Sequence, residues 1–210
     1  MTVDELSYAI LTKLDRSTDE GLFNAIKLSV QGKWALLVRR EVRDRGDSIQ
    51  YEQTIRVPLT EGQIDIQCGL PIIDNCPILK STEPLPAYLD LPGRFPYKVS
   101  TLDRLTTIDY IQPEQLPYTL ERRYTGNKFW YTLSNRYLYI YNTRLLENVL
   151  VTFVPDTPEN TEEFDCITCG TKPVISAWME DSITKMVIQD LNILQANRDK
   201  EDIDETIIHN

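Results

Sequence analysis

Proline is unevenly spread along this chain, and its distribution restricts the fold more than any other feature. Six of the twelve prolines fall between Thr60 and Pro96. Proline fixes φ and has no backbone N–H, so it interrupts helices and is kept out of central strands. We therefore expect this stretch to be rich in loops, with short strands at Ile78–Ser81 and Tyr97–Leu102.

The first 46 residues show apolar side chains at helical spacing. Thr2 with Glu5, and Ser17 with Glu20, have the spacing of capping boxes, which mark helix starts. Gly46 is placed to end the second helix. Residues 1–46 are therefore expected to form two antiparallel helices joined by a short turn, an αα-hairpin.

The second of these helices is expected to run from about residue 19 to about residue 43. Gly32 lies inside it and costs about 1 kcal/mol relative to alanine, which predicts a kink or a close helix contact. Arg39, Arg40 and Arg43 cluster near its end. Cations favour a helix C-terminus, and arginine is also favoured at protein interfaces. The cluster therefore either caps the helix and aids solubility or contacts an acidic patch on a neighbouring subunit.

Apolar residues then alternate, which is typical of strands. This pattern predicts strands at Ile49–Leu59, Phe129–Leu133, Tyr137–Tyr141 and Val149–Val154. Asn135 tolerates a positive φ and favours a hairpin turn between the second and third of these. The alternating tyrosines either pack one face of the sheet against a helix or loop or stack on a ligand ring. We favour packing, because no polar cluster accompanies them.

A last amphipathic helix is expected from about Ser176 to about Asn197. The residues after it, 198–210, carry two basic and five acidic side chains and few apolar groups. Alone such a segment would not fold, so it is predicted to be an extended tail that orders on a partner. Ile203, Ile207 and Ile208 are the candidate anchor residues in this tail.

These expectations define an α+β fold: an N-terminal αα-hairpin and a C-terminal helix packed with a small antiparallel, proline-rich β region. The expected divisions are a helical hairpin over 1–46 and an antiparallel β region over 47–156. A linker and helix over 157–197 complete the helical body, and a polar tail covers 198–210.

The formal net charge is −10, and the isoelectric point is near 4.7. An acidic surface repels the phosphate backbone, so tight, sequence-specific nucleic-acid binding is not expected. DNA could still pass through a carboxylate-lined channel without adhering. The sequence shows no secretion signal and no membrane-length apolar run, so synthesis and use in a cytoplasm are expected.

The residue types needed for common catalytic mechanisms are missing or poorly placed. His209 is the only histidine and is the second-to-last residue of the predicted tail, whereas a catalytic base must be held rigidly. The chain has no glycine-rich phosphate loop, and no carboxylate pair stands out by its spacing. We therefore expect no enzymatic activity and no cofactor.

The four cysteines are a weak candidate for metal or redox chemistry. Cys166 and Cys169 form a C-x-x-C pair, but Gly170-Thr-Lys-Pro does not indicate a helix start after it. Cys68 and Cys76 do not have a standard zinc-knuckle spacing. Free structural thiols are favoured over a zinc or redox module, which stays an alternative.

The order of these segments resembles a known family. Lys33-Trp-Ala-Leu-Leu-Val-Arg-Arg ends a helix, and a proline-rich β middle follows. Tyr131-Thr-Leu-Ser-Asn-Arg-Tyr-Leu-Tyr-Ile-Tyr-Asn and the strand Val149-Leu-Val-Thr-Phe-Val-Pro-Asp come next, before an acidic linker and a last helix. This order is similar to that of neck proteins of tailed bacteriophages, particularly crAss-like phages.

The resemblance implies a virion structural protein. Such proteins form rings, commonly twelve-fold, that connect the portal to the tail and line the DNA channel. The implied partners are further copies of the chain, the portal protein, adjacent neck or tail ring proteins and passing double-stranded DNA, with no membrane. It implies synthesis in the host cytoplasm and a final location in the virion. Another virion tail or capsid accessory protein is the alternative within this class.

Overall fold

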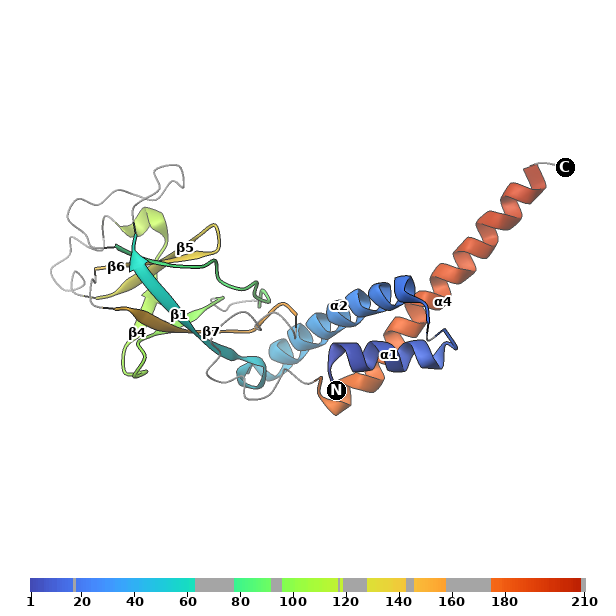
Figure 1. Ribbon diagram of the computed structural model, residues 1–210, viewed down its shortest axis with the longest axis horizontal. Helices are drawn as coiled ribbons and strands as arrows, with labels where there is room; N and C mark the ends of the chain where they lie inside the picture. The colour runs from blue at the N-terminus through green and yellow to red at the C-terminus, as the bar shows by residue number, and fades with distance from the viewer. Residues whose placement is uncertain are drawn as a thin grey trace. The chain divides into compact units, whose positions relative to one another are not determined.

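The computed structural model describes residues 1–16, 18–62, 78–91, 96–116, 118, 128–142, 146–157 and 175–208, with side chains through residue 192 (Figure 1). The chain divides into two compact units. One contains Met1–Gly46 and Lys172–Asn210 and is helical, and the other contains Asp47–Asp156 and carries the strands. The expected α+β class is confirmed.

The helical unit contains α1 (Val3–Lys13), α2 (Glu20–Arg45) and α4 (Ala177–Ile208). The first predicted capping box is confirmed, because the Thr2 hydroxyl accepts from the Glu5 amide and the Glu5 carboxylate accepts from the Thr2 amide. The second, Ser17 with Glu20, includes a residue outside the described part of the chain, and it is not the N-cap of α2. Asp19 caps α2, since its Oδ1 accepts from the Leu22 amide at 2.9 Å.

The start of α1 lies beside the first third of α2, and later residues of α1 meet still earlier residues of α2. Lys27 Nζ is 2.8 Å from Asp4 Oδ1, and the rings of Tyr8 and Phe23 are 4.5 Å apart. The core of this unit is formed by apolar side chains from all three helices. They include Val3, Leu6, Ile10, Ile26, Val30, Trp34, Met179, Ile183 and Val187.

The predicted end of the last helix and the extended tail are wrong. α4 runs to Ile208, eleven residues beyond the expected end at Asn197. Residues 198–208 contain neither proline nor glycine. Starting a helix is unfavourable, because several residues must be ordered before the first hydrogen bond forms. Extending an existing helix adds one hydrogen bond for each residue that is ordered, so a polar sequence can continue it without burying an apolar face.

The β unit is a closed barrel, not the small antiparallel sheet that was expected. Its strands are β1 (Gln53–Glu61), β2 (Ile78–Ser81), β3 (Lys98–Ser100), β4 (Thr107–Tyr110), β5 (Trp130–Ser134), β6 (Tyr137–Tyr141) and β7 (Asn148–Phe153). They follow the order β1-β2-β6-β5-β4-β3-β7, and β7 pairs with β1 to close the barrel. The β4–β5 pair is parallel and the other pairs are antiparallel.

Alternate residues of the strands form one apolar core, as the period of two requires. This core includes Ile55, Val57, Val99, Ile108, Tyr131, Leu138, Ile140, Val149, Val151 and Phe153. The predicted hairpin is confirmed, with Ser134 paired to Tyr137 and the turn residues Asn135 and Arg136 at φ 49° and 66°. Both turn residues have the positive φ that matches the twist of paired strands.

The first predicted strand begins four residues later than expected. Ile49–Tyr51 form a 3-10 turn, because the Asp47 carboxylate accepts from the Ile49 amide at 2.9 Å and favours a local turn. The strands expected at Ile78–Ser81 and Tyr97–Leu102 are present as β2 and the shorter β3. The strand β4 was not expected.

Candidate interaction surfaces

The outer face of α2 carries an exposed apolar row. The side chains of Leu28 and Leu36 are 70% and 51% exposed. Gly32 lies between them, and apart from the adjacent backbone of α2 itself no described atom lies within 4 Å of the position that a Cβ would take there. The close contact expected at Gly32 is therefore not made within the described part of the chain. Because these positions are four residues apart, they share one face of the helix.

Arg39, Arg40 and Arg43 continue this face toward the end of α2, and all three are exposed. Asp44 lies 3.8 Å from Arg40 and 3.6 Å from Arg43, distances longer than a good charge-assisted hydrogen bond. Between residues 39 and 45 the helix carries four arginines and two carboxylates. This end of α2 is therefore a local basic patch on an acidic protein.

Arg45 has a different role from its neighbours. Its guanidinium lies 2.8 Å from a carboxylate oxygen of Glu41, whose side chain is only 6% exposed. A buried carboxylate without a cation would be costly, so Arg45 compensates Glu41. We call the exposed row formed by Leu28, Gly32, Leu36, Arg39, Arg40 and Arg43 the α2 stripe.

The other predicted partner-binding residues, Ile203, Ile207 and Ile208, lie in α4 and not in an extended tail. The structure describes the helix backbone at these positions but not their side chains. The segment 198–208 carries five carboxylates and two basic residues. The structure thus presents an acidic helix end in place of the expected polar tail.

A third surface, which the sequence did not indicate, is the loop between β3 and β4. Leu105 is 85% exposed and Leu102 is 43% exposed at its tip. The loop is held by its own polar groups: the Asp103 carboxylate accepts from the Thr101 hydroxyl and from the Leu105 amide. Arg104 adopts φ 60° in the same turn. Two leucines are therefore presented on a turn that is already ordered, which lowers the entropic cost of binding.

The hydrogen bonds to Asp103 also affect the pKa of its carboxyl group. They favour the ionised carboxylate and lower the pKa of Asp103 from its ordinary value, with Thr101 as the largest cause and the Leu105 amide next.

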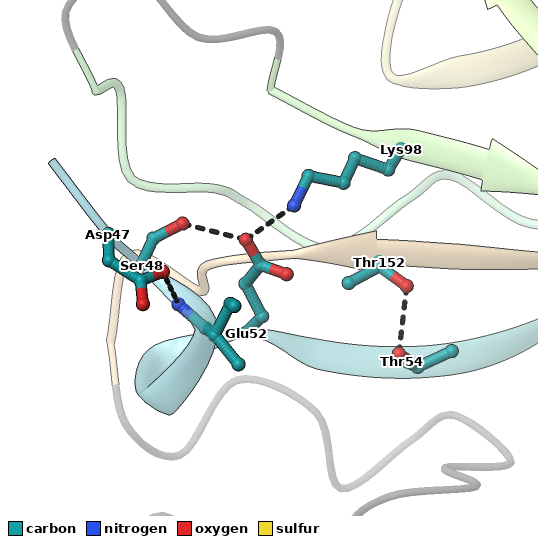
Figure 2. A network of polar contacts seen from close by, with 7 residues as sticks. Asp47, Ser48, Glu52, Thr54, Lys98 and Thr152 are labelled. Carbon is teal, nitrogen blue, oxygen red and sulfur yellow. Dashed lines mark hydrogen bonds and ion pairs between the residues drawn. The ribbon is translucent and has the colours of Figure 1, made fainter.

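A polar network at the start of the barrel has a structural role (Figure 2). The Glu52 carboxylate accepts from the Ser48 hydroxyl at 2.7 Å and from Lys98 Nζ at 2.7 Å, which connects the start of β1 to β3. Thr54 and Thr152 form a 2.8 Å hydroxyl contact across the β1–β7 pair that closes the barrel. These contacts fix strands in place.

Comparison with known families decides the class of this protein. A family model described as phage tail ring protein 2, of the crAss-like type, matches residues 5–206. The chain belongs to this phage tail ring protein family. The match spans both the helical unit and the barrel, and it confirms the resemblance seen in the order of segments. The comparison with curated proteins found no match.

The tyrosine row of this ring protein is used for packing, as expected. Tyr139 and Tyr141 are buried in a second apolar cluster with Ile111 and Leu116. Tyr137 is half-buried, and Lys80 Nζ lies 4.1 Å from the centre of its ring, a cation–π contact. The interpretation as a ligand-stacking platform is therefore not supported at Tyr139 and Tyr141.

The cysteines of the weak metal alternative, Cys68, Cys76, Cys166 and Cys169, lie outside the described residues, as does His209. Within the described part of the chain, no group of three or more metal-ligating side chains comes together. No described helix has the length and apolar character needed to cross a membrane.

Proposed function

We propose that this ring protein is one subunit of a closed ring in the phage neck, which connects the portal to the tail. The observation that carries the proposal is the family match over residues 5–206, because it includes both folded units. The ring is a homo-oligomer, with twelve copies as the expected number. The protein acts as a structural part of the virion, without catalysis.

A ring needs two different surfaces on each subunit, because one copy must contact the next in a head-to-tail manner. The residues proposed for these contacts are Arg39, Arg40 and Arg43 on α2 and Ile203, Ile207 and Ile208 on α4. Leu102 and Leu105 supply a further contact from the barrel unit toward an adjacent neck or tail ring protein. Arginine is enriched at interfaces, and exposed apolar side chains such as those of Leu102 and Leu105 can mark an interaction site.

The acidity of the chain supports a role around DNA. The net charge of −10 repels phosphate groups, so DNA inside the ring would move without sequence-specific binding. The protein would be made in the host cytoplasm and then incorporated into the particle.

Quantitative mass spectrometry of purified virions tests this proposal. We expect the chain in purified particles at a 1:1 molar ratio to the portal protein if both form rings of equal copy number. Presence in infected-cell lysate together with absence from purified particles would rule out the virion role.

A ring further along the tail, or another tail or capsid accessory part, is the second candidate. It is favoured by the family description, which places the ring in the tail. Separation of filled heads from detached tails distinguishes the two. A neck ring is expected to remain with the portal-bearing heads, and a ring of the distal tail is expected with the detached tails.

A further inference from the structure

The basic and acidic ends of the helical unit lie far apart within one chain. Lys33 Nζ is 2.7 Å from Asp190 Oδ2, which fixes the register of α2 against α4. The two helices run in opposite directions, and the C-terminal part of α4 extends past α1 and α2 (Figure 1). An α-helix rises about 1.5 Å per residue. Measured along the helix axes, residue 199 therefore lies about 14 Å from this ion pair, and Arg39 lies about 9 Å from it in the opposite direction.

The charges of these two ends cannot compensate each other within the chain. Their separation, about 23 Å or more at 1.5 Å per residue, exceeds twice the Debye length of about 8 Å at physiological ionic strength. Segment 198–208 carries a net charge of −3, from five carboxylates and two basic residues. The α2 stripe carries the three exposed arginines near the opposite end. Residues 39–45 carry a net charge of +2, from four arginines and two carboxylates, so each end keeps a net charge that the other end of the same chain cannot offset.

The two surfaces also match in spacing. On α2, Leu28, Gly32, Leu36 and Arg40 follow one another at intervals of four residues. On α4, positions 199, 203 and 207 do the same, occupied by an aspartate and two isoleucines. Helices commonly pack by interdigitating such four-residue rows. An antiparallel alignment places position 199 at Arg40, 203 at Leu36 and 207 at the open space beside Gly32.

We propose that segment 198–208 of each copy lies along the α2 stripe of the next copy. This inference rests on the ring proposed above and specifies its subunit contact. Each copy then gives one surface and receives the other, which is the heterologous contact that a closed ring requires. Apolar contacts at Leu28, Gly32 and Leu36 supply burial, and the arginines set the direction and register.

Complementation between two variants tests the contact. The first variant carries Leu36→Glu with Arg40→Glu, and the second is truncated after Asn197. By sedimentation velocity, we expect the wild-type chain to self-associate, less strongly at high salt, and each variant alone to associate at least tenfold more weakly. Each variant keeps one intact surface, so an equal mixture should form 1:1 dimers and no larger species.

Lys185→Glu is the matched control. Lys185 and Arg40 are both exposed basic residues that pair with an aspartate four residues away in the helix. Reversal at Lys185 should leave association unchanged. A second test of register is the charge exchange Arg40→Glu with Asp199→Arg, which should recover association that either single change weakens. Circular dichroism of every variant checks that the helices are kept.

Several outcomes would overturn the inference. A wild-type chain that stays monomeric at its highest soluble concentration would do so. A truncated chain that self-associates as the wild type does but no longer binds the portal would also overturn it, because the end of α4 would then bind the portal and not the next copy. In both cases the chain could still be found in purified virions, so this failure is distinct from failure of the proposed virion role.

Discussion

Arg136 occupies a position in the β5–β6 turn where an arginine is expected to be unfavourable, and its substitution gives a quantitative test of the barrel. Its φ is 66°, and the left-handed region costs a residue with a Cβ about 1–2 kcal/mol. Its Nε and Nη2 donate to the Leu85 carbonyl at 3.0 and 2.8 Å. The Leu85 amide in turn donates to the Arg136 carbonyl at 2.7 Å.

Arg136→Gly removes the two side-chain bonds and keeps the backbone bond. Loss of a hydrogen bond from a charged donor to a half-buried acceptor costs about 1.5–3 kcal/mol. Relief of the positive φ returns about 1 kcal/mol once the greater loss of chain entropy by glycine is subtracted. We therefore expect the free energy of unfolding, measured in urea by circular dichroism, to fall by about 0.5–2 kcal/mol, from the difference of these terms.

Arg104→Gly is the control, because it makes the same change at a similar backbone angle. Arg104 has φ 60° in the exposed β3–β4 loop. Its side chain makes no hydrogen bond to the described residues, so relief of φ should leave the unfolding free energy unchanged or raise it by up to about 1 kcal/mol. Equal effects of the two substitutions would refute a stabilising role for the Arg136–Leu85 contact.

Three further predictions concern the barrel, its loop and the cysteines. Burial raises the pKa of Tyr97 and Tyr131 above the ordinary 10.0. As pH rises above 10, the unfolded state therefore loses these protons before the folded state does, and the free energy of unfolding should fall. Urea unfolding between pH 9 and 11 measures this slope, which Tyr131→Phe should reduce. Leu105→Ser should change the unfolding free energy by less than about 0.5 kcal/mol, since the residue is exposed, yet weaken capture of the adjacent ring protein in pull-down assays. Denatured protein without reductant should titrate as four free thiols, with no zinc by elemental analysis.

Features decided by close neighbours in the chain could be predicted from the sequence. The Thr2–Glu5 capping box and the left-handed Gly46 that ends α2 each depend on residues within about four positions. The turn at Asn135 follows in the same way from the conformational tolerance of asparagine. Local chemistry was therefore sufficient for the start of α1, the end of α2 and the β5–β6 hairpin.

Closure of the barrel could not be predicted because it depends on distant residues. Gln53 pairs with Phe153, and β4 pairs in parallel with β5 at Asp109 and Trp130. Alternation in a strand shows which residues share a face but does not identify the neighbouring strand. The continuation of α4 was missed for a different reason: an acidic composition was taken to exclude helix, although polar residues can extend one that has already formed.

The exposed surfaces that we propose as contacts could be recognised only in part from the sequence. The arginines of α2 could be found because they cluster near a predicted helix end, and the structure shows that they share a face with Leu28 and Leu36. The β3–β4 loop was missed, because Leu102 was assigned to the predicted strand Tyr97–Leu102 and Leu105 was not considered. The sequence feature that could have indicated this loop is Asp103, which lies two residues after Thr101 and two residues before Leu105. Aspartate side chains often accept from the backbone amide two residues later and so stabilise turns.

Cryo-electron microscopy of the intact particle tests the central claim most directly. The reconstruction is first calculated without imposed symmetry and then with the symmetry that this first map shows. We predict a ring between portal and tail in which each subunit shows a three-helix unit and a seven-stranded barrel. The DNA path should pass through its centre. Density for this fold on the capsid surface, or in no ordered part of a particle that contains the protein, would contradict the account.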